Sequence, residues 1–77
     1  MNNSINLSDV YDLSKRVEIM KEHGDSKTMF TGTNTNDELV TISIFPNRIV
    51  VATYQKNNWI RTNTYWEDGT DEETFSR

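Results

Sequence analysis

The chain has 77 residues, one histidine and no cysteine, which fits a single domain near the lower size limit for folding without disulfides. The absence of cysteine excludes disulfides, thiolate metal sites and cysteine nucleophiles. The net charge is −4 and no basic patch is visible, so we expect no direct binding to duplex nucleic acid.

The first predicted element is an amphipathic helix at about residues 7–23. Its apolar stripe recurs at three- and four-residue steps and consists of Val10, Leu13, Val17 and Met20. Asn6 or Ser8 is the expected N-cap, and Gly24 is the expected left-handed residue after the helix. Ile19 lies on the side away from the stripe, where we expect it to be exposed.

A β-meander is predicted for about residues 27–76. Its four or five strands are expected in the segments KTMFTGT, ELVTISIF, RIVVATYQ, WIRTNTYW and TDEETF. The sequence therefore predicts one α+β domain over residues 1–77. In this fold, the N-terminal amphipathic helix packs on a four- to five-stranded antiparallel sheet.

Two-residue turns are expected at Pro46-Asn47, Asn57-Asn58 and Asp68-Gly69, and they fix which residues share a face. The face predicted to receive the helix gathers Val40, Ile42, Ile44, Ile49, Val51, Ile60, Trp66 and Phe75. The other predicted face gathers Leu39, Phe45, Val50, Tyr54, Trp59 and Tyr65. A sheet face left to water is normally plainly polar, and this second face is not.

The negative charge is concentrated at the C-terminal end. Residues 67–77 contain five acids and one arginine, which gives −4, whereas residues 1–66 contain seven acids and seven bases, which gives zero. The acids are Glu67, Asp68, Asp71, Glu72 and Glu73. Their spacing does not match a calcium-binding EF-hand loop. Two interpretations remain: a charged edge strand that discourages pairing with other chains, or an electrostatic docking element for a basic partner.

An aromatic surface is predicted on the second face, formed by Tyr54, Trp59, Arg61 and Tyr65. Tyrosine, tryptophan and arginine are enriched at the energetic centres of protein interfaces. The expected register places Tyr54 opposite Arg61, so that the guanidinium can lie against the ring. Ordinary cross-strand stabilisation, or cover by the N-terminus, is the competing interpretation. Single-stranded nucleic acid could stack on such rings, but the acidic charge disfavours it.

No pattern in the chain indicates catalysis. His23 is interpreted as a helix C-terminal residue that interacts with the helix dipole. The serines lack a surrounding motif, and the isolated glycines form no phosphate-binding loop. We therefore expect no enzymatic activity, cofactor or metal. The polar N-terminus and the absence of a long apolar run predict a cytoplasmic protein without a membrane segment.

The segment VATYQKNNWIRTNTYWEDGT, residues 51–70, resembles a recurring segment of small phage proteins. The whole chain, acidic, without cysteine and with a helix before a meander, resembles accessory proteins of phages and mobile elements of Gram-positive bacteria, including anti-CRISPR proteins. This resemblance implies an inhibitor that acts in a bacterial host and blocks the nucleic-acid-binding site of a CRISPR effector nuclease. It assigns no role to any individual residue.

Together these observations predict a non-enzymatic inhibitor or regulator that binds a protein partner with a basic surface. The predicted partner-binding residues are Tyr54, Trp59, Arg61, Tyr65, Glu67, Asp68, Asp71, Glu72 and Glu73. The alternative is a self-associating structural module in which the aromatic sheet face forms a homodimer interface.

Overall fold

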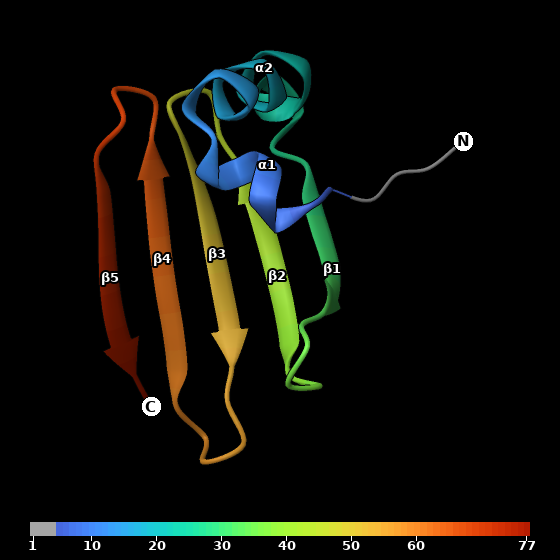
Figure 1. Ribbon diagram of the computed structural model, residues 1–77, viewed down its shortest axis with the longest axis vertical. Coiled ribbons are helices and arrows are strands. Elements are labelled where there is room, and N and C mark those ends of the chain that lie inside the picture. Colours follow the sequence, from blue (N-terminus) through green and yellow to red (C-terminus); the bar gives the residue numbers. More distant parts are fainter. Residues whose placement is uncertain (1–4) are drawn as a thin grey trace.

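The structure, a computed structural model, describes residues 5–77 as short helical segments and one β-sheet (Figure 1). The helical part comprises α1 (Leu7–Tyr11), α2 (Leu13–His23) and the 3-10 turn η1 (Gly24–Ser26). The strands are β1 (Met29–Thr33), β2 (Leu39–Ile44), β3 (Arg48–Tyr54), β4 (Ile60–Trp66) and β5 (Asp71–Ser76).

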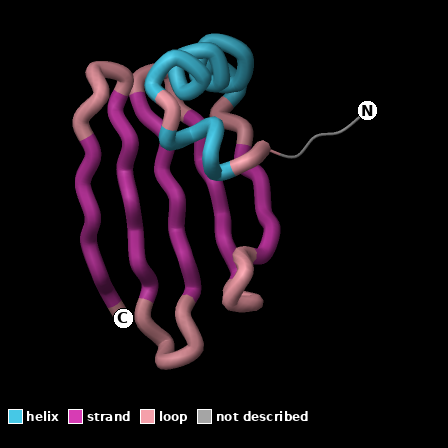
Figure 2. Tube along the Cα trace, in the orientation of Figure 1, coloured by secondary structure: helices cyan, strands magenta, loops and turns pink. Residues whose placement is uncertain are grey.

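Each strand pairs antiparallel with its neighbour in the chain, so the five-stranded sheet has the order β1-β2-β3-β4-β5. The helices lie on one face of this sheet, beside β1 to β3, whereas β4 and β5 extend past them (Figures 1 and 2). We call the face that carries the helices the helix side and the opposite one the outer face. The α+β fold class is confirmed; residues 1–4 of the predicted domain lie outside the described residues.

The predicted helix over residues 7–23 is interrupted at Asp12, which has extended backbone angles (φ −86, ψ 118). The Asp12 carboxylate caps α2 because it accepts hydrogen bonds from the Ser14 backbone N–H (3.1 Å) and the Lys15 backbone N–H (3.3 Å). The break rotates the two segments relative to each other. As a result Leu13, predicted for the buried stripe, is 44% exposed, and Arg16 is buried instead.

Gly24 has a right-handed conformation (φ −62), so its predicted role as a left-handed cap is wrong. The left-handed residue is Lys27 (φ 52), which follows η1. Gly24 is required for a different reason: a Cβ atom there would lie 2.9 Å from the Phe45 carbonyl oxygen and from the Pro46 Cα. The helix end and the β2–β3 turn therefore approach more closely than a side chain would permit.

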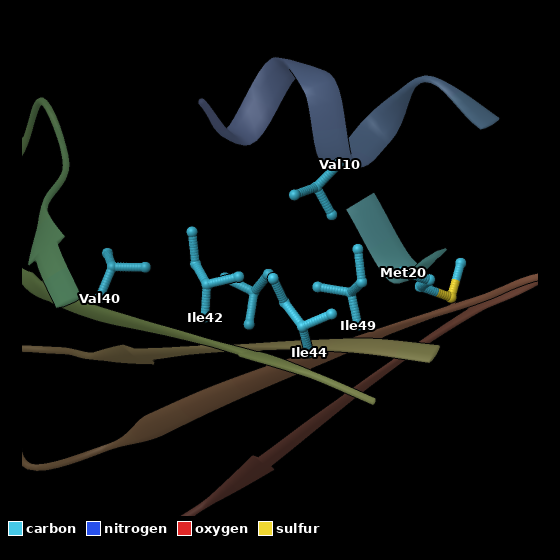
Figure 3. Packing of buried hydrophobic residues seen from close by; sticks show 7 residues of the cluster. Val10, Met20, Val40, Ile42, Ile44 and Ile49 are labelled. Atoms are coloured by element: carbon cyan, nitrogen blue, oxygen red, sulfur yellow. The ribbon is translucent and has the colours of Figure 1, made fainter. Parts of the chain in front are cut away.

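The buried core lies between the helices and strands β2 and β3 (Figure 3). It consists of Val10, Met20, Val40, Ile42, Ile44, Ile49 and Val51. The residues that β2 and β3 contribute are those predicted from their alternating pattern. Ile19, expected to be exposed, is partly buried and packs against this cluster, because the break at Asp12 reorients α2.

One of the three predicted two-residue turns is present. The Pro46-Asn47 turn is confirmed by the pairing of Ile44 with Ile49. The other two turns each contain one more residue than predicted. Tyr54 pairs with Ile60, and the Gln55 N–H donates to the Trp59 carbonyl (2.8 Å).

The same holds between β4 and β5, where Tyr65 pairs with Asp71 and the Trp66 N–H donates to the Thr70 carbonyl (2.9 Å). Because side chains alternate along a strand, the first one-residue shift moves every β4 side chain to the opposite face. Ile60 and Trp66 are therefore on the outer face, and not in the core as predicted. The second shift cancels the first, so Phe75 stays on the predicted helix side.

Candidate protein-binding surfaces

The residues predicted to bind a partner are divided between the two faces of the sheet. Those on the helix side of the β4–β5 hairpin are Arg61, Tyr65, Asp71 and Glu73, with Trp59 just before β4. Tyr54 and Glu72 are on the outer face, and Glu67 and Asp68 are in the connecting turn. The predicted contact between Tyr54 and Arg61 is wrong: Tyr54 pairs with Ile60, and Arg61 pairs with Thr53.

Tyr65 belongs to the junction between the hairpin and the helices. Its ring lies 5.3 Å from the ring of Tyr11 and 5.2 Å from the guanidinium carbon of Arg16. Burial, followed by the interaction with Tyr11 and the charge of Asp71, raises the pKa of Tyr65 to about 12. Tyr65 therefore anchors the upper part of the hairpin, the end near the β4–β5 turn, to α1. It is only partly available to a partner.

Arg16 connects the helices to the sheet, and the sequence analysis missed it. It is 4% exposed and donates to three backbone carbonyls: Val10 (2.7 Å), Trp66 (3.0 Å) and Tyr11 (3.4 Å). These carbonyls come from α1 and from the end of β4. The available signal was its spacing, since Arg16 is four residues before the buried Met20.

The lower part of the hairpin extends past the helices, and its helix side is open (Figure 1). Phe75 is 54% exposed there. The guanidinium carbon of Arg77 lies 4.4 Å from the centre of the Trp59 ring, and the Asn63 amide donates to the Glu73 carboxylate (2.9 Å). We use the name hairpin surface for the helix-side residues of this hairpin other than Tyr65: Trp59, Arg61, Asn63, Asp71, Glu73, Phe75 and Arg77. Asp71 lies at its upper end, opposite Tyr65.

Arg61 lies in the middle of the hairpin surface. Its Nε atom is buried, and among residues 5–77 no group accepts a hydrogen bond from it. A buried donor without an acceptor costs free energy that a carboxylate or carbonyl oxygen brought close to it would recover.

The turn between β4 and β5 displays acidic side chains at the end of the hairpin. The Asp68 carboxylate accepts hydrogen bonds from the Thr70 hydroxyl (2.7 Å) and the Thr70 N–H (3.0 Å), and these bonds lower the pKa of Asp68. The Glu67 N–H donates to the Asn47 carbonyl (3.1 Å), which ties this turn to the β2–β3 turn. The acids of the turn are thus held in place by the backbone while their charge remains at the surface.

The outer face of the sheet has few charges. Its side chains alternate with the core residues and comprise Met29, Thr31, Thr33, Leu39, Thr41, Ser43, Arg48, Val50, Ala52, Tyr54, Ile60, Thr62, Thr64, Trp66, Glu72, Thr74 and Ser76. Within the described strands, Arg48 and Glu72 are the charged residues on this face. Met29, Leu39 and Tyr54 are 62%, 49% and 41% exposed.

Arg48 is packed between aromatic rings on this face. Its guanidinium carbon lies 4.2 Å from the centre of the Phe45 ring and 5.6 Å from the centre of the Trp66 ring. The charge is therefore partly covered by aromatic groups, which favours a contact surface that is easily dehydrated. An outer face rich in aromatic residues was predicted, but Ile60 and Trp66 occupy the places expected for Trp59 and Tyr65.

Other kinds of site have little support in residues 5–77. No group of three histidine, cysteine or acidic residues in that range is arranged to hold a metal ion. None of the helices there has the length and apolarity needed to span a membrane. No protein-family model matches the chain, and no curated protein or solved structure is significantly similar to it.

Proposed function

We propose that the protein is a non-enzymatic regulator that binds a basic protein partner through the hairpin surface and the acidic turn. The observation that carries this proposal is the placement of five acids on one hairpin, with Glu67 and Asp68 in its turn and Asp71, Glu72 and Glu73 along β5. Trp59 and Phe75 are toward the opposite end of the same hairpin, past the helices (Figure 1). Aromatic groups supply contact area, and the acids supply charge complementarity, which raises the association rate and the specificity.

A partner that handles nucleic acid fits this chemistry. Its binding groove contains lysines and arginines that neutralise phosphates, and carboxylates on a projecting hairpin would compete for the same groups. The resemblance to anti-CRISPR proteins makes a CRISPR effector nuclease the first partner class to test, with the acidic hairpin occupying the groove intended for nucleic acid.

The test uses a purified, guide-loaded effector nuclease, with DNA cleavage and direct binding as readouts. We expect inhibition that weakens as salt increases, because exposed charges are screened over about 8–10 Å near physiological ionic strength. Asp71→Lys with Glu73→Lys should abolish it. The matched control is Glu18→Lys with Glu22→Lys on exposed positions of α2, which changes the net charge by the same amount. Equal loss in both double variants would contradict a site-specific role of the hairpin.

A second candidate function is self-association through the outer face, which would make the protein a structural module. The observation that favours it is the scarcity of charge on that face, combined with the exposure of Met29, Leu39 and Tyr54. Thr62 lies near its centre, so Thr62→Glu should convert such a dimer into a monomer in sedimentation or light scattering. A dimer that is unchanged by Thr62→Glu would rule out this interface. Trp59 is on the helix side of the hairpin and does not test it.

A further inference from the structure

The two edges of the sheet differ sharply in charge. β5 forms one edge and contains Asp71, Glu72 and Glu73, which discourage pairing with another strand. β1 forms the other edge with the sequence MFTGT, which has no charge and no proline. An uncharged edge strand of this kind is a template for pairing with an additional strand.

The hydrogen-bonding groups of β1 are directed by its register with β2. The Ile44 N–H donates to the Thr28 carbonyl (2.9 Å), and the Asn34 N–H donates to the Glu38 carbonyl (3.1 Å). Even-numbered residues of β1 therefore bond to β2, because bonded and non-bonded residues alternate along an antiparallel strand. The N–H and C=O groups of Met29, Thr31 and Thr33 point away from the sheet.

An apolar groove lies beside this edge on the helix side. Its volume is about 220 Å³, and its lining includes Ile5, Leu7, Phe30, Gly32, Val40 and Ile42. A Cβ atom added to Gly32 would meet nothing within 4 Å. The space beside Gly32 is therefore open, although Phe30 and Gly32 are neighbours on the same side of β1.

We propose that two copies of the chain pair β1 with β1 in antiparallel fashion about a twofold axis at Thr31, joining two five-stranded sheets into one. In this register Thr31 faces Thr31 of the second copy, and Met29 faces its Thr33. These are the residues whose backbone groups point outward, so each pair exchanges two hydrogen bonds.

The same register places Phe30 opposite Gly32 of the second copy, and the reverse. These are non-hydrogen-bonded pairs, in which side chains lie closest together. Each phenyl ring would cover a glycine of the other chain and enter the open groove beside it. β1 is thus self-complementary about Thr31, because the large side chain of Phe30 lies opposite Gly32, which has no side chain.

Charge also favours a second copy at this edge. Lys27 precedes β1 and Asp37 follows its end, so antiparallel pairing brings Lys27 of one copy toward Asp37 of the other at both ends of the interface. Pairing β5 with β5 would instead bring the three acids of each copy into one interface. A twofold β1 contact also leaves the acidic hairpin free at both outer edges, so this proposal does not depend on the proposed function.

Cross-linking tests the predicted axis. The chain contains no cysteine, so Thr31→Cys introduces a sole thiol whose Cα would lie about 5.5 Å from its counterpart, within disulfide range. Thr33→Cys is the matched control, because two copies of residue 33 would be offset by four residues, about 13 Å along the strand direction. We expect a covalent dimer from Thr31→Cys and none from Thr33→Cys; equal cross-linking of the two variants would overturn the register.

Solution mass separates this interface from one on the outer face. Wild type should have about twice the monomer mass of 9.0 kDa. Gly32→Glu, which fits the monomer because the space is open, should restore the monomer, whereas Thr62→Glu should remain a dimer. Amide exchange at Thr31 should slow in the wild-type dimer and be fast in Gly32→Glu. A monomeric wild type with a rapidly exchanging Thr31 amide, or a dimer that survives Gly32→Glu, would refute the proposal.

Discussion

Arg16 joins the two helices to the sheet. It is 4% exposed and donates to the carbonyls of Val10, Tyr11 and Trp66. Arg16→Met keeps the apolar stem but leaves these acceptors without a donor, so we expect a loss of about 2–4 kcal/mol in the free energy of unfolding. Urea denaturation of the variant and of wild type measures this loss in the free energy of unfolding. The neighbouring exposed Lys15→Met should cost less than about 1 kcal/mol, and similar losses would contradict a structural role for Arg16.

Tyr65 makes stability depend on alkaline pH. Its pKa is raised from 10.0 to about 12 by burial and by Tyr11. The unfolded chain therefore ionises first, and the contribution of Tyr65 is complete below about pH 10 and is lost as pH rises toward 12. Subtracting the absorbance titration of Tyr65→Phe from that of wild type should give a tyrosinate transition near 12. A midpoint near 10 would show that Tyr65 is not buried beside Tyr11 in solution.

For individual residues, the sequence predicted the core residues of β2 and β3. Apolar and polar side chains alternate along these strands, and in a strand with one covered face the apolar set must be the buried one. It did not predict Arg16, because a helical pattern treats arginine as a solvent residue. Burial of Arg16 depends on carbonyls near the break at Asp12 and at Trp66, fifty positions away. No sequence pattern indicates which backbone carbonyls will lie next to Arg16 after folding.

At the scale of elements, the junction between α1 and α2 depends on the cap formed by Asp12. Hydrogen bonds from Ser14, then from the Lys15 N–H, lower the pKa of Asp12, so the contribution of the cap is present above about pH 4 and is lost as pH falls through the lowered value. Asp12→Ala should reduce Tm by several degrees at neutral pH, and by less in acid.

Asp12→Asn is the matched control, because an amide oxygen caps a helix without titrating. Its Tm should stay near the wild-type value at neutral pH. An Asp12→Ala variant with wild-type Tm at neutral pH would mean that the helix runs through residue 12 in solution.

The two mispredicted turns share one local design. Asn57 and Asp68 each accept a hydrogen bond from the N–H two residues later, at Trp59 (3.2 Å) and Thr70 (3.0 Å). Asn58 (φ 70) and Gly69 (φ 95) then adopt positive φ. This is the three-residue hairpin connection that ends in a left-handed residue. Asn-Asn and Asp-Gly also suit the two-residue connection, so the dipeptides alone could not fix the faces of β4.

At the scale of the whole molecule, the core is displaced toward one edge of the sheet. The buried cluster involves α1, α2, β2 and β3, whereas every residue of β5 is exposed. β5 is therefore held mainly by its backbone pairing with β4. This asymmetry leaves β5 exposed at one edge of the sheet, whereas the apolar groove lies beside β1 at the other edge.

The same asymmetry predicts that the cost of deleting a large apolar side chain depends on its position across the sheet. Ile49 is 0% exposed and Phe75 is 54% exposed. Ile49→Ala should lose about 2–5 kcal/mol, much of the roughly 4–12 kcal/mol expected for a domain of this length. Phe75→Ala should lose less than about 1 kcal/mol.

Denaturation of both variants, with amide exchange along the strands, measures this gradient. The amides of β5 should exchange fastest, because local opening begins where few apolar contacts must be broken. A loss for Phe75→Ala as large as that for Ile49→Ala would mean that the hairpin surface is covered in solution by another chain. The acids of the hairpin would then face that chain, and a free docking hairpin would no longer describe the protein.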